Sequence, residues 1–419
     1  MIEQDSEHIV IEHQDGLWTA EHAAHRLAGP QRIQVGGQDM ALGTPFHVDD
    51  VSDEAAVASR PRAYRKGGVA VVSTSGRFPF GRPLEYQQTC RYAGNHVRVT
   101  VDIQWPRDTA VQRHLGLGGV VLPGEWKRFF CVPPALHQAS GTVGRWERIP
   151  TPPSAGETMI GHWHRPPLAL VFERADGAAL ELGTGSDLWR WESAFGAGLE
   201  GGSYKVLLRK EGIQIVREPL MCCSPHTPVP RPYRLSWYMA WRGAKGTWTT
   251  QVLKGERRLF TLGANGELIA ENGEIPSDSH LIDSGECIVL DVGGCVWPAE
   301  WRRSGSVPDF IRGTLLSVPC WHSTGVQKAV RRAIRQLKGR GREGQLLLHG
   351  LYPGVCWGPQ HLGRSAENGL VHWDINAVLD LVAWTRQQLG DGWRVWLEPG
   401  HWTELPSLVG SGERNGFRT

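Results

Sequence analysis

Apolar and polar residues alternate strictly along residues 96–105. Side chains of an extended strand point to opposite faces in turn, so this pattern predicts a half-buried strand with His96 and Arg98 on its polar face. Similar runs predict further strands at 7–12, 69–73, 168–173, 204–209, 213–217, 233–241, 247–253, 258–262 and 287–291. Many short strands in series are typical of an antiparallel β-sandwich. Asn265-Gly266 and Asn272-Gly273 supply residue pairs suited to hairpin turns.

The hydrophobic period changes after about Pro308. Apolar residues then recur at spacings of three and four across 326–338, which predicts an amphipathic helix with Lys and Arg on its outer face. A second helix is expected over 375–389, with Asp374 as its N-cap and Gly390 just beyond its end. Apolar strands at 345–348 and 393–397 follow the two helices, so this region is expected to be α/β.

These patterns divide the chain into three parts. Residues 1–60 form a polar N-terminal segment, 61–305 a β-sandwich domain that binds or cleaves carbohydrate, and 306–419 a smaller α/β region. The fold class expected is therefore mainly β, an antiparallel, supersandwich-like β-sandwich with an α/β C-terminal region.

Charge and composition narrow the function. Lys and Arg total 45 against 43 Asp and Glu, so no strong field attracts nucleic acid or an anionic membrane. No apolar run is long enough to span a bilayer, and the acidic start does not resemble a secretory signal. The eight cysteines form no CxxC pair, which favours reduced thiols and a cytoplasmic location. No nucleotide-binding signature is present, so no cofactor and no metal are expected.

Tryptophan is unusually abundant, with 19 residues. Five of them lie in three short tryptophan clusters with charged or histidine neighbours, at 161–164, 187–192 and 237–241. An indole offers a flat apolar face and one N–H donor, which suits a sugar. The alternative is that these rings fill the core or the strand contacts.

Two carboxylates, Asp187 and Glu192, lie five residues apart beside Trp189 and Trp191. Glycoside cleavage usually needs such a pair as acid and base, so the four residues are candidates for catalysis and for sugar stacking. In the alternative interpretation, Asp187 caps a turn and Glu192 is solvated.

His162 and His164 flank Trp163, and on a strand the two imidazoles would share a face. They are candidates for acid-base work or sugar binding, with metal ligation and a purely structural role as alternatives. Earlier in the chain, a dense group of aromatic, cationic and acidic residues fits either a polyhydroxyl ligand or an exposed loop without a binding role. Its members are Arg113, His114, Glu125 and Trp126.

One family resemblance rests on the order of these features: the polar-faced strand within 86–104, Arg113-His114, the Leu-Pro-Gly-Glu-Trp turn at 122–126, and Asp-Leu-Trp-Arg-Trp-Glu at 187–192. Over about residues 60–290 this order resembles the β-supersandwich of galactose-mutarotase-like proteins. The resemblance implies a concave sheet that binds carbohydrate through His, Arg, Trp and an acidic residue.

The C-terminal Leu346-Leu347-Leu348-His349 is weakly similar to the last segment of polysaccharide deacetylases, although the metal motif expected before it is missing. His349 is otherwise a histidine at the end of a strand. We therefore expect a glycoside hydrolase or polysaccharide lyase acting on an oligosaccharide. The alternatives are a non-catalytic carbohydrate-binding or structural sandwich and a deacetylase-like metal hydrolase.

Overall fold

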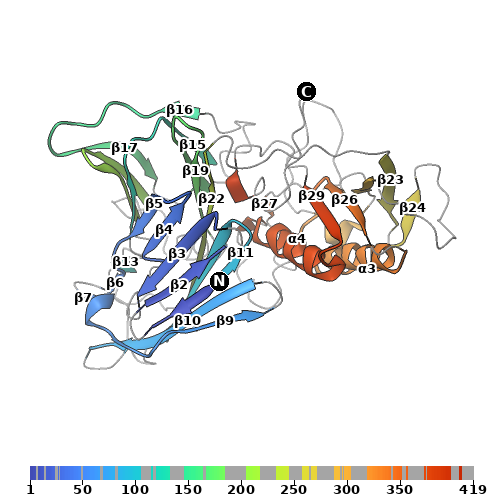
Figure 1. Cartoon of the computed structure of the whole chain (residues 1–419), viewed down its shortest axis with the longest axis horizontal. Coiled ribbons are helices and arrows are strands. Elements are labelled where there is room, and N and C mark those ends of the chain that lie inside the picture. Colours follow the sequence, from blue (N-terminus) through green and yellow to red (C-terminus); the bar gives the residue numbers. More distant parts are fainter. Residues whose placement is uncertain are drawn as a thin grey trace. The chain divides into compact units, whose positions relative to one another are not determined.

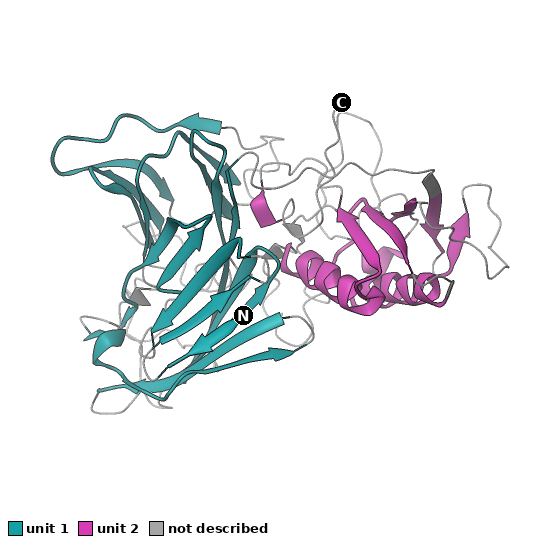
Figure 2. Cartoon of the chain, in the orientation of Figure 1, with its two compact units in different colours: residues 1–248 teal, residues 249–419 magenta. Residues whose placement is uncertain are grey.

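The computed structural model forms two compact units, residues 1–248 and 249–419 (Figure 1, Figure 2). None of the helices it describes combines the length and hydrophobicity needed to cross a bilayer. The structure describes all residues except 6–7, 14–15, 24–26, 28, 49–50, 67–68, 81–83, 105–114, 117–118, 133–145, 164–166, 185–203, 218–232, 245–256, 264–265, 271–286, 293–294, 296, 303–318, 341–342, 352–354, 357–371, 374, 398–404 and 408–419.

Two large antiparallel sheets build the first unit. The strands of the nine-stranded sheet are, in spatial order, β1 (Ile2–Gln4), β2 (His8–Glu12), β3 (Trp18–Ala23), β4 (Arg32–Val35), β5 (Gln38–Gly43), β14 (Val120–Pro123), β21 (Gly212–Arg217), β20 (Tyr204–Arg209) and β17 (Glu157–Trp163).

The strands of the ten-stranded sheet are β16 (Trp146–Arg148), β15 (Arg128–Val132), β18 (Ala169–Glu173), β19 (Ala179–Thr184), β22 (Tyr233–Arg242), β12 (His96–Gln104), β11 (Leu84–Ala93), β10 (Val69–Phe78), β8 (Val57–Ala58) and β9 (Arg62–Lys66), the last pairing with β10. A small sheet joins β13 (Leu115–Gly116), β6 (His47–Val48) and β7 (Val51–Ser52), followed by the 3-10 helix η1 (Asp53–Ala55).

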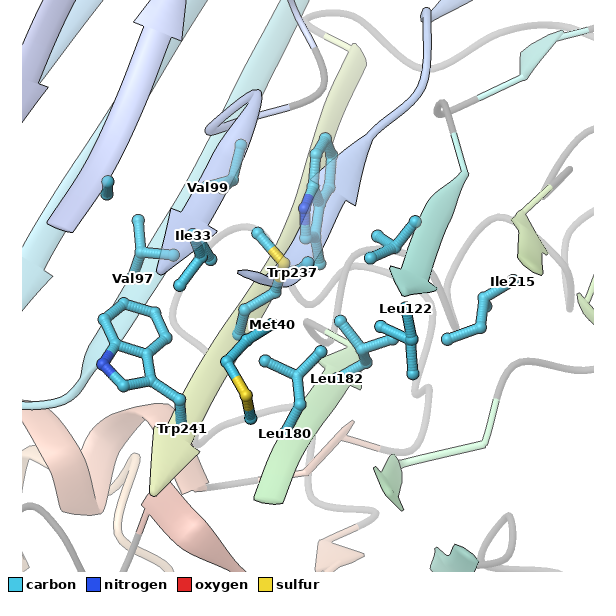
Figure 3. Packing of buried hydrophobic residues seen from close by; sticks show 14 of the residues in the cluster. Ile33, Met40, Val97, Val99, Leu122, Leu180, Leu182, Ile215, Trp237 and Trp241 are labelled. Atoms are coloured by element: carbon cyan, nitrogen blue, oxygen red, sulfur yellow. The ribbon is translucent and has the colours of Figure 1, made fainter. Parts of the chain in front are cut away.

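The core lies between the two large sheets. On β12, Val97, Val99, Val101 and Ile103 are fully buried, as the alternation predicts. They belong to one cluster with Ile33 and other residues of the nine-stranded sheet (Figure 3). The predicted antiparallel β-sandwich is confirmed.

The N-terminal segment differs from the prediction. Residues 1–60 were expected to be a polar segment with one strand at 7–12. That strand is present as β2, but β1 to β5 together supply five strands of the nine-stranded sheet. Ile9, Ile11 and Ile33 point into the core from these strands, whereas the residues next to them, such as Val10 and Gln34, are only half-buried. Each of these strands is short, so the alternation of apolar and polar residues covers too few positions to give a strong periodic signal.

The second unit contains a five-stranded mixed sheet. In spatial order its strands are β24 (Leu268–Ala270), β23 (Arg257–Leu262), β25 (Cys287–Asp291), β26 (Gly344–His349) and β29 (Trp393–Leu397). The last four are parallel to one another, and β24 joins β23 in an antiparallel hairpin that contains Gly266 at φ 80°. A two-stranded ladder joins β27 (Val355–Cys356) to β28 (His372–Trp373).

The boundary between the units lies at 248/249 rather than at 305/306. Strands 258–262 and 287–291 were expected in the antiparallel sandwich but belong to the parallel sheet. Residues 287–290 are all buried, as expected for a parallel strand covered on both faces. The apolar run at 287–291 predicts a strand, but it does not predict which sheet this strand joins.

The described part of this unit also contains the 3-10 turn η2 (Ala299–Trp301) and two long helices. The predicted helices are confirmed as α3 (Thr324–Arg340) and α4 (Ile375–Leu389), and Gly390 ends α4 at φ 85°. Part of the basic face of α3 packs on α4, because Arg331 and Arg335 lie over the ring of Trp384 at 5.2 and 5.4 Å. The predicted strand 247–253 lies outside the described residues.

Candidate functional site

The outer face of the ten-stranded sheet carries polar side chains that are buried. Glu181 and Tyr238 are 0% exposed, and His96 and Ser236 are nearly so. Arg98, two residues beyond His96 on β12, is half-buried. Carboxylates are almost never fully buried without a specific partner, so the burial of Glu181 indicates that neighbouring side chains bind it. We call these five residues, His96, Arg98, Glu181, Ser236 and Tyr238, the polar face.

The strand register aligns the polar face. His96 of β12 pairs with Ala240 of β22, and Ala240 pairs with Glu181 of β19, so the three residues form one row across the sheet. In the next row, Arg98 pairs with Tyr238. Residues in register have side chains on the same face, and the small Ala240 separates the imidazole from the carboxylate.

A glycine lets Tyr238 reach Glu181. Tyr238 Oη donates a hydrogen bond of 2.6 Å to Glu181 Oε1. A Cβ atom on Gly183, the register partner of Tyr238, would lie 1.9 Å from the phenol ring. The ring therefore lies flat over Gly183. Hydrogen bonds to a charged group contribute more than neutral ones, so this contact helps to hold the buried carboxylate.

The same row becomes apolar and aromatic on its other side. Beyond Glu181 it continues through Val171 and Phe130 to Trp146 of β16. The rings of Phe130 and Trp146 are 5.5 Å apart, and the Arg128 guanidinium lies 4.2 Å above the Trp146 ring. One face of this sheet thus combines aromatic surface with hydrogen-bonding groups, the combination that a sugar requires.

Ion pairs border the polar face. On one side, Glu173 accepts from Arg128 at 2.7 Å and from Arg242 at 3.1 Å. Burial lowers the pKa of Arg242, and the charge of Glu173 opposes that shift. On the other side, Arg234 pairs with Asp102 at 2.6 Å.

Most of the predicted site residues lie outside the described part of the chain. This applies to Arg113, His114, His164, Asp187, Trp189, Trp191 and Glu192. In sequence, however, segment 185–203 directly follows Thr184 of β19, and segment 105–114 follows Gln104 of β12. Both strands carry residues of the polar face.

His162 and Trp163 lie on opposite faces of β17, in the nine-stranded sheet. Trp163 packs against the core, and a Cβ on Gly161 would meet its ring at 2.4 Å. His162 is exposed. The structure therefore does not bring these two residues into a shared surface, and neither lies on the polar face.

Glu125 and Trp126 lie between β14 and β15. The Trp126 ring is 6% exposed, its Nε1 donates to the carbonyl of Pro123 at 3.2 Å, and Arg174 covers it at 4.7 Å. Glu125 is exposed. The structure does not bring them together with Trp163.

The separation follows from the register along β21. Pro123, close to Glu125, pairs with Gly212 at the start of β21. Arg217, at the end of the same strand, pairs with Tyr204, and Tyr204 pairs with Trp163. The described members of the two predicted groups therefore lie toward opposite ends of β21. A ligand role for Glu125 and Trp126 stays a prediction.

Many of the tryptophans are core residues. Trp237 and Trp241, in the tryptophan cluster at 237–241, are at most 1% exposed. The Arg217 guanidinium stacks on Trp237 at 4.8 Å. Sequence reasoning missed His96 and Glu181 as candidates. The signal for His96 was present, because the alternation of β12 already placed it beside Arg98 on a polar face. Glu181 had no such signal, since its strand is short and mainly apolar.

A second pair of polar residues lies in the α/β unit. His349, the last residue of β26, pairs through Nδ1 with Asp291 Oδ1 at 2.9 Å. Asp291 was not a sequence candidate. No group of three or more His, Cys, Asp or Glu residues gathers as a metal site within the described part of the chain.

No protein-family model matches the chain, and no curated protein matches it in sequence. Among solved structures, a β-arabinopyranosidase is similar with 9% identity and a TM-score of 0.33, over 94% of this chain and 56% of that one. An α-N-acetylgalactosaminidase, NagBb from Bifidobacterium bifidum, has 11% identity and a TM-score of 0.33, over 95% and 70%. A glycoside hydrolase family 97 enzyme from Pseudoalteromonas sp. strain K8 has 8% identity and a TM-score of 0.35, over 93% and 66%.

These neighbours are glycoside hydrolases. The chain spans about half the length of the first of them. TM-scores of 0.33 to 0.35 do not establish a shared fold.

Proposed function

We propose that this protein is carbohydrate-active and that it binds an oligosaccharide along the polar face and the aromatic residues beside it. The observation that carries the proposal is the row from Trp146 through Glu181 to His96, which joins an aromatic platform to a buried, hydrogen-bonded carboxylate. The presence of His, Arg, Trp and an acidic residue on one sheet supports the proposal, because these are the residue types that the resemblance implies for a sugar-binding sheet.

The length of the row suits an oligosaccharide. Trp146 and His96 lie five strands apart, which is roughly 24 Å at about 4.8 Å per strand. The accessible groups are the half-buried Trp146, at one end of this row, and Arg98, in the next row beside His96. The Trp146 ring would stack on the apolar face of a sugar, and Arg98 would donate to hydroxyl or carboxylate oxygens. The hydrogen bond between Glu181 and Tyr238 would hold the strands between Trp146 and Arg98 in place.

Bond cleavage in this proposal is assigned to Asp187 and Glu192, in the segment that follows β19. A hydrolase needs one carboxyl group protonated and the other ionised at working pH, so their surroundings must separate their pKa values. A lyase would use one such group as a base. His162 and His164 remain proposed helpers in proton transfer.

Binding is tested with the full chain and a panel of neutral and acidic oligosaccharides, followed by intrinsic tryptophan fluorescence. Arg98→Gln should weaken binding by about 10- to 100-fold, because a hydrogen bond to a charged group contributes about 1.5–3 kcal/mol. Trp146→Ala should weaken it as well. Glu211→Gln, in the exposed turn between β20 and β21, is the matched control. Equal affinity of all three variants would refute the site.

Catalysis is tested separately on any oligosaccharide that the wild type cleaves. Asp187→Asn or Glu192→Gln should lower the rate by roughly 10²–10⁴-fold while leaving affinity nearly unchanged, with a bell-shaped pH profile in the wild type. If Arg98→Gln abolishes binding and no panel member is ever cleaved, the protein is a carbohydrate-binding module instead.

A further inference from the structure

The carboxyl ends of three neighbouring strands meet in the α/β unit. β23, β25 and β26 are parallel, and their last residues include Leu262, Asp291 and His349. In open α/β sheets, ligands bind outside the carboxyl ends of the strands, because the loops that follow can be varied without disturbing the sheet. Polar residues at this edge are therefore candidates for chemistry.

Asp291 and His349 are held together by the sheet itself. They are register partners at the ends of β25 and β26, and the amide of Val292 donates to the carbonyl of His349 at 2.9 Å just beyond them. The side-chain contact joins His349 Nδ1 to Asp291 Oδ1 at 2.9 Å. The exposed fractions of the two side chains are 36% for His349 and 18% for Asp291, so a small molecule can reach the imidazole.

The contact with Asp291 orients His349 for use as a general base. A carboxylate on Nδ1 fixes the ring orientation and the tautomer that carries its proton on Nδ1, and it stabilises the imidazolium that forms after proton uptake. Proton exchange with a substrate then falls to Nε2. Histidine is the side chain that enzymes most often use as a general base, and the orientation seen here suits His349 to that role.

The neighbouring thiol does not act as a nucleophile. Cys295 Sγ donates to the carbonyl of Asp291 and accepts from the amide of Leu262, both at 3.1 Å. The residue is 4% exposed, and burial raises the pKa of its thiol to about 11. Because only the thiolate attacks, the Cys295 thiol is unsuited to this role, whereas water can reach the partly exposed imidazole.

We propose that Asp291 and His349 form an acid-base dyad that hydrolyses a small acyl ester, an activity separate from the saccharide function proposed above. His349 Nε2 takes a proton from water while the water oxygen bonds to the acyl carbon. The ester C–O bond then breaks, and the departing alkoxide receives the proton from the imidazolium. Ester and water give acid and alcohol, and no other reactant is needed. Glycosidic bonds usually require two carboxyl groups, which makes an ester the better match for one imidazole.

In this dyad His349 is the catalytic residue and Asp291 a positioning residue. The test uses the full chain and 4-nitrophenyl acetate. His349→Gln should lower the rate by roughly 10²–10⁴-fold, the contribution of general acid-base catalysis. His8→Gln, which alters a partly exposed histidine of the other unit, should leave the rate unchanged and thus corrects for ordinary surface imidazole.

Asp291→Asn supplies a second readout. Without the carboxylate the imidazolium loses its partner, so the acid limb of the pH-rate profile should move to lower pH as the rate falls. A role confined to folding would lower the rate without moving that limb. Should either variant fail to fold, the wild-type profile decides, because the rate must rise with imidazole deprotonation.

Three results would overturn the dyad. One is a wild-type rate no greater than that of an equal amount of free imidazole, and another is an unchanged rate in His349→Gln. The third is loss of activity on chelation with recovery on adding Zn²⁺, which would make His349 a metal ligand with Asp291 behind it. None of these outcomes bears on oligosaccharide binding by Arg98 and Trp146, so the two proposals can fail independently.

Discussion

Acid should destabilise the sandwich through one buried histidine. His22, on β3, is 2% exposed, and its Nε2 lies 2.5 Å from the hydroxyl of Tyr92 on β11. Burial lowers the pKa of His22 from 6.5 to about 3, so the folded protein keeps the ring neutral where the unfolded chain protonates it. The stabilising contribution is complete above pH 6.5 and is lost as the pH falls toward 3.

The size of the effect follows from the two pKa values. Linkage gives a loss of about 1.4 kcal/mol for each pH unit well inside this window, and about 2 kcal/mol between pH 7.5 and pH 5.0. In His22→Gln the side chain still offers Tyr92 an acceptor but no longer titrates. That variant should therefore lose about 2 kcal/mol less than the wild type over the same pH interval.

Urea unfolding followed by tryptophan fluorescence measures this difference, because Trp18 stacks on Tyr92 at 5.7 Å. The exposed His162, changed to Gln, is the matched control and should keep the wild-type pH dependence. The reasoning is refuted if His22→Gln loses as much stability as the wild type between the two pH values.

Other substitutions test the packing directly. Tyr238→Phe should cost about 1.5–3 kcal/mol in urea unfolding, since Glu181 loses a charged hydrogen bond; no change would mean that its other contacts suffice. Gly183→Ala should destabilise by about 1–3 kcal/mol because its Cβ would meet the Tyr238 ring, whereas Gly339→Ala, in open space on α3, should stabilise by about 0.5–1 kcal/mol; the same sign for both would contradict the packing. Cys295 should resist iodoacetamide at pH 8 until the chain unfolds, and rapid labelling of the folded protein would contradict its burial.

Local patterns were enough to predict many of the longer regular elements. Strict alternation predicted β12 and its buried valines, and the change of period predicted α3 and α4, because both signals depend on neighbours close in sequence. The same alternation identified the polar face of β12, including His96 and Arg98. Strand pairing, in contrast, depends on residues far apart in the sequence. An apolar run such as 287–291 fits a parallel or an antiparallel sheet equally well, and only tertiary packing assigned it to the α/β unit.

The candidate sites show the same division. Sequence proximity suggested that His162 and Trp163 act together, but a strand sends neighbouring side chains to opposite faces. Residues far apart in the chain, in contrast, meet across neighbouring strands. Asp291 and His349, 58 positions apart, are register partners, and Tyr238 donates to Glu181 across 57 positions from the adjacent row. The sequence determined which residue types each strand carries. The tertiary structure decided which of them share a surface, because register between strands is set by the packing of the whole sheet.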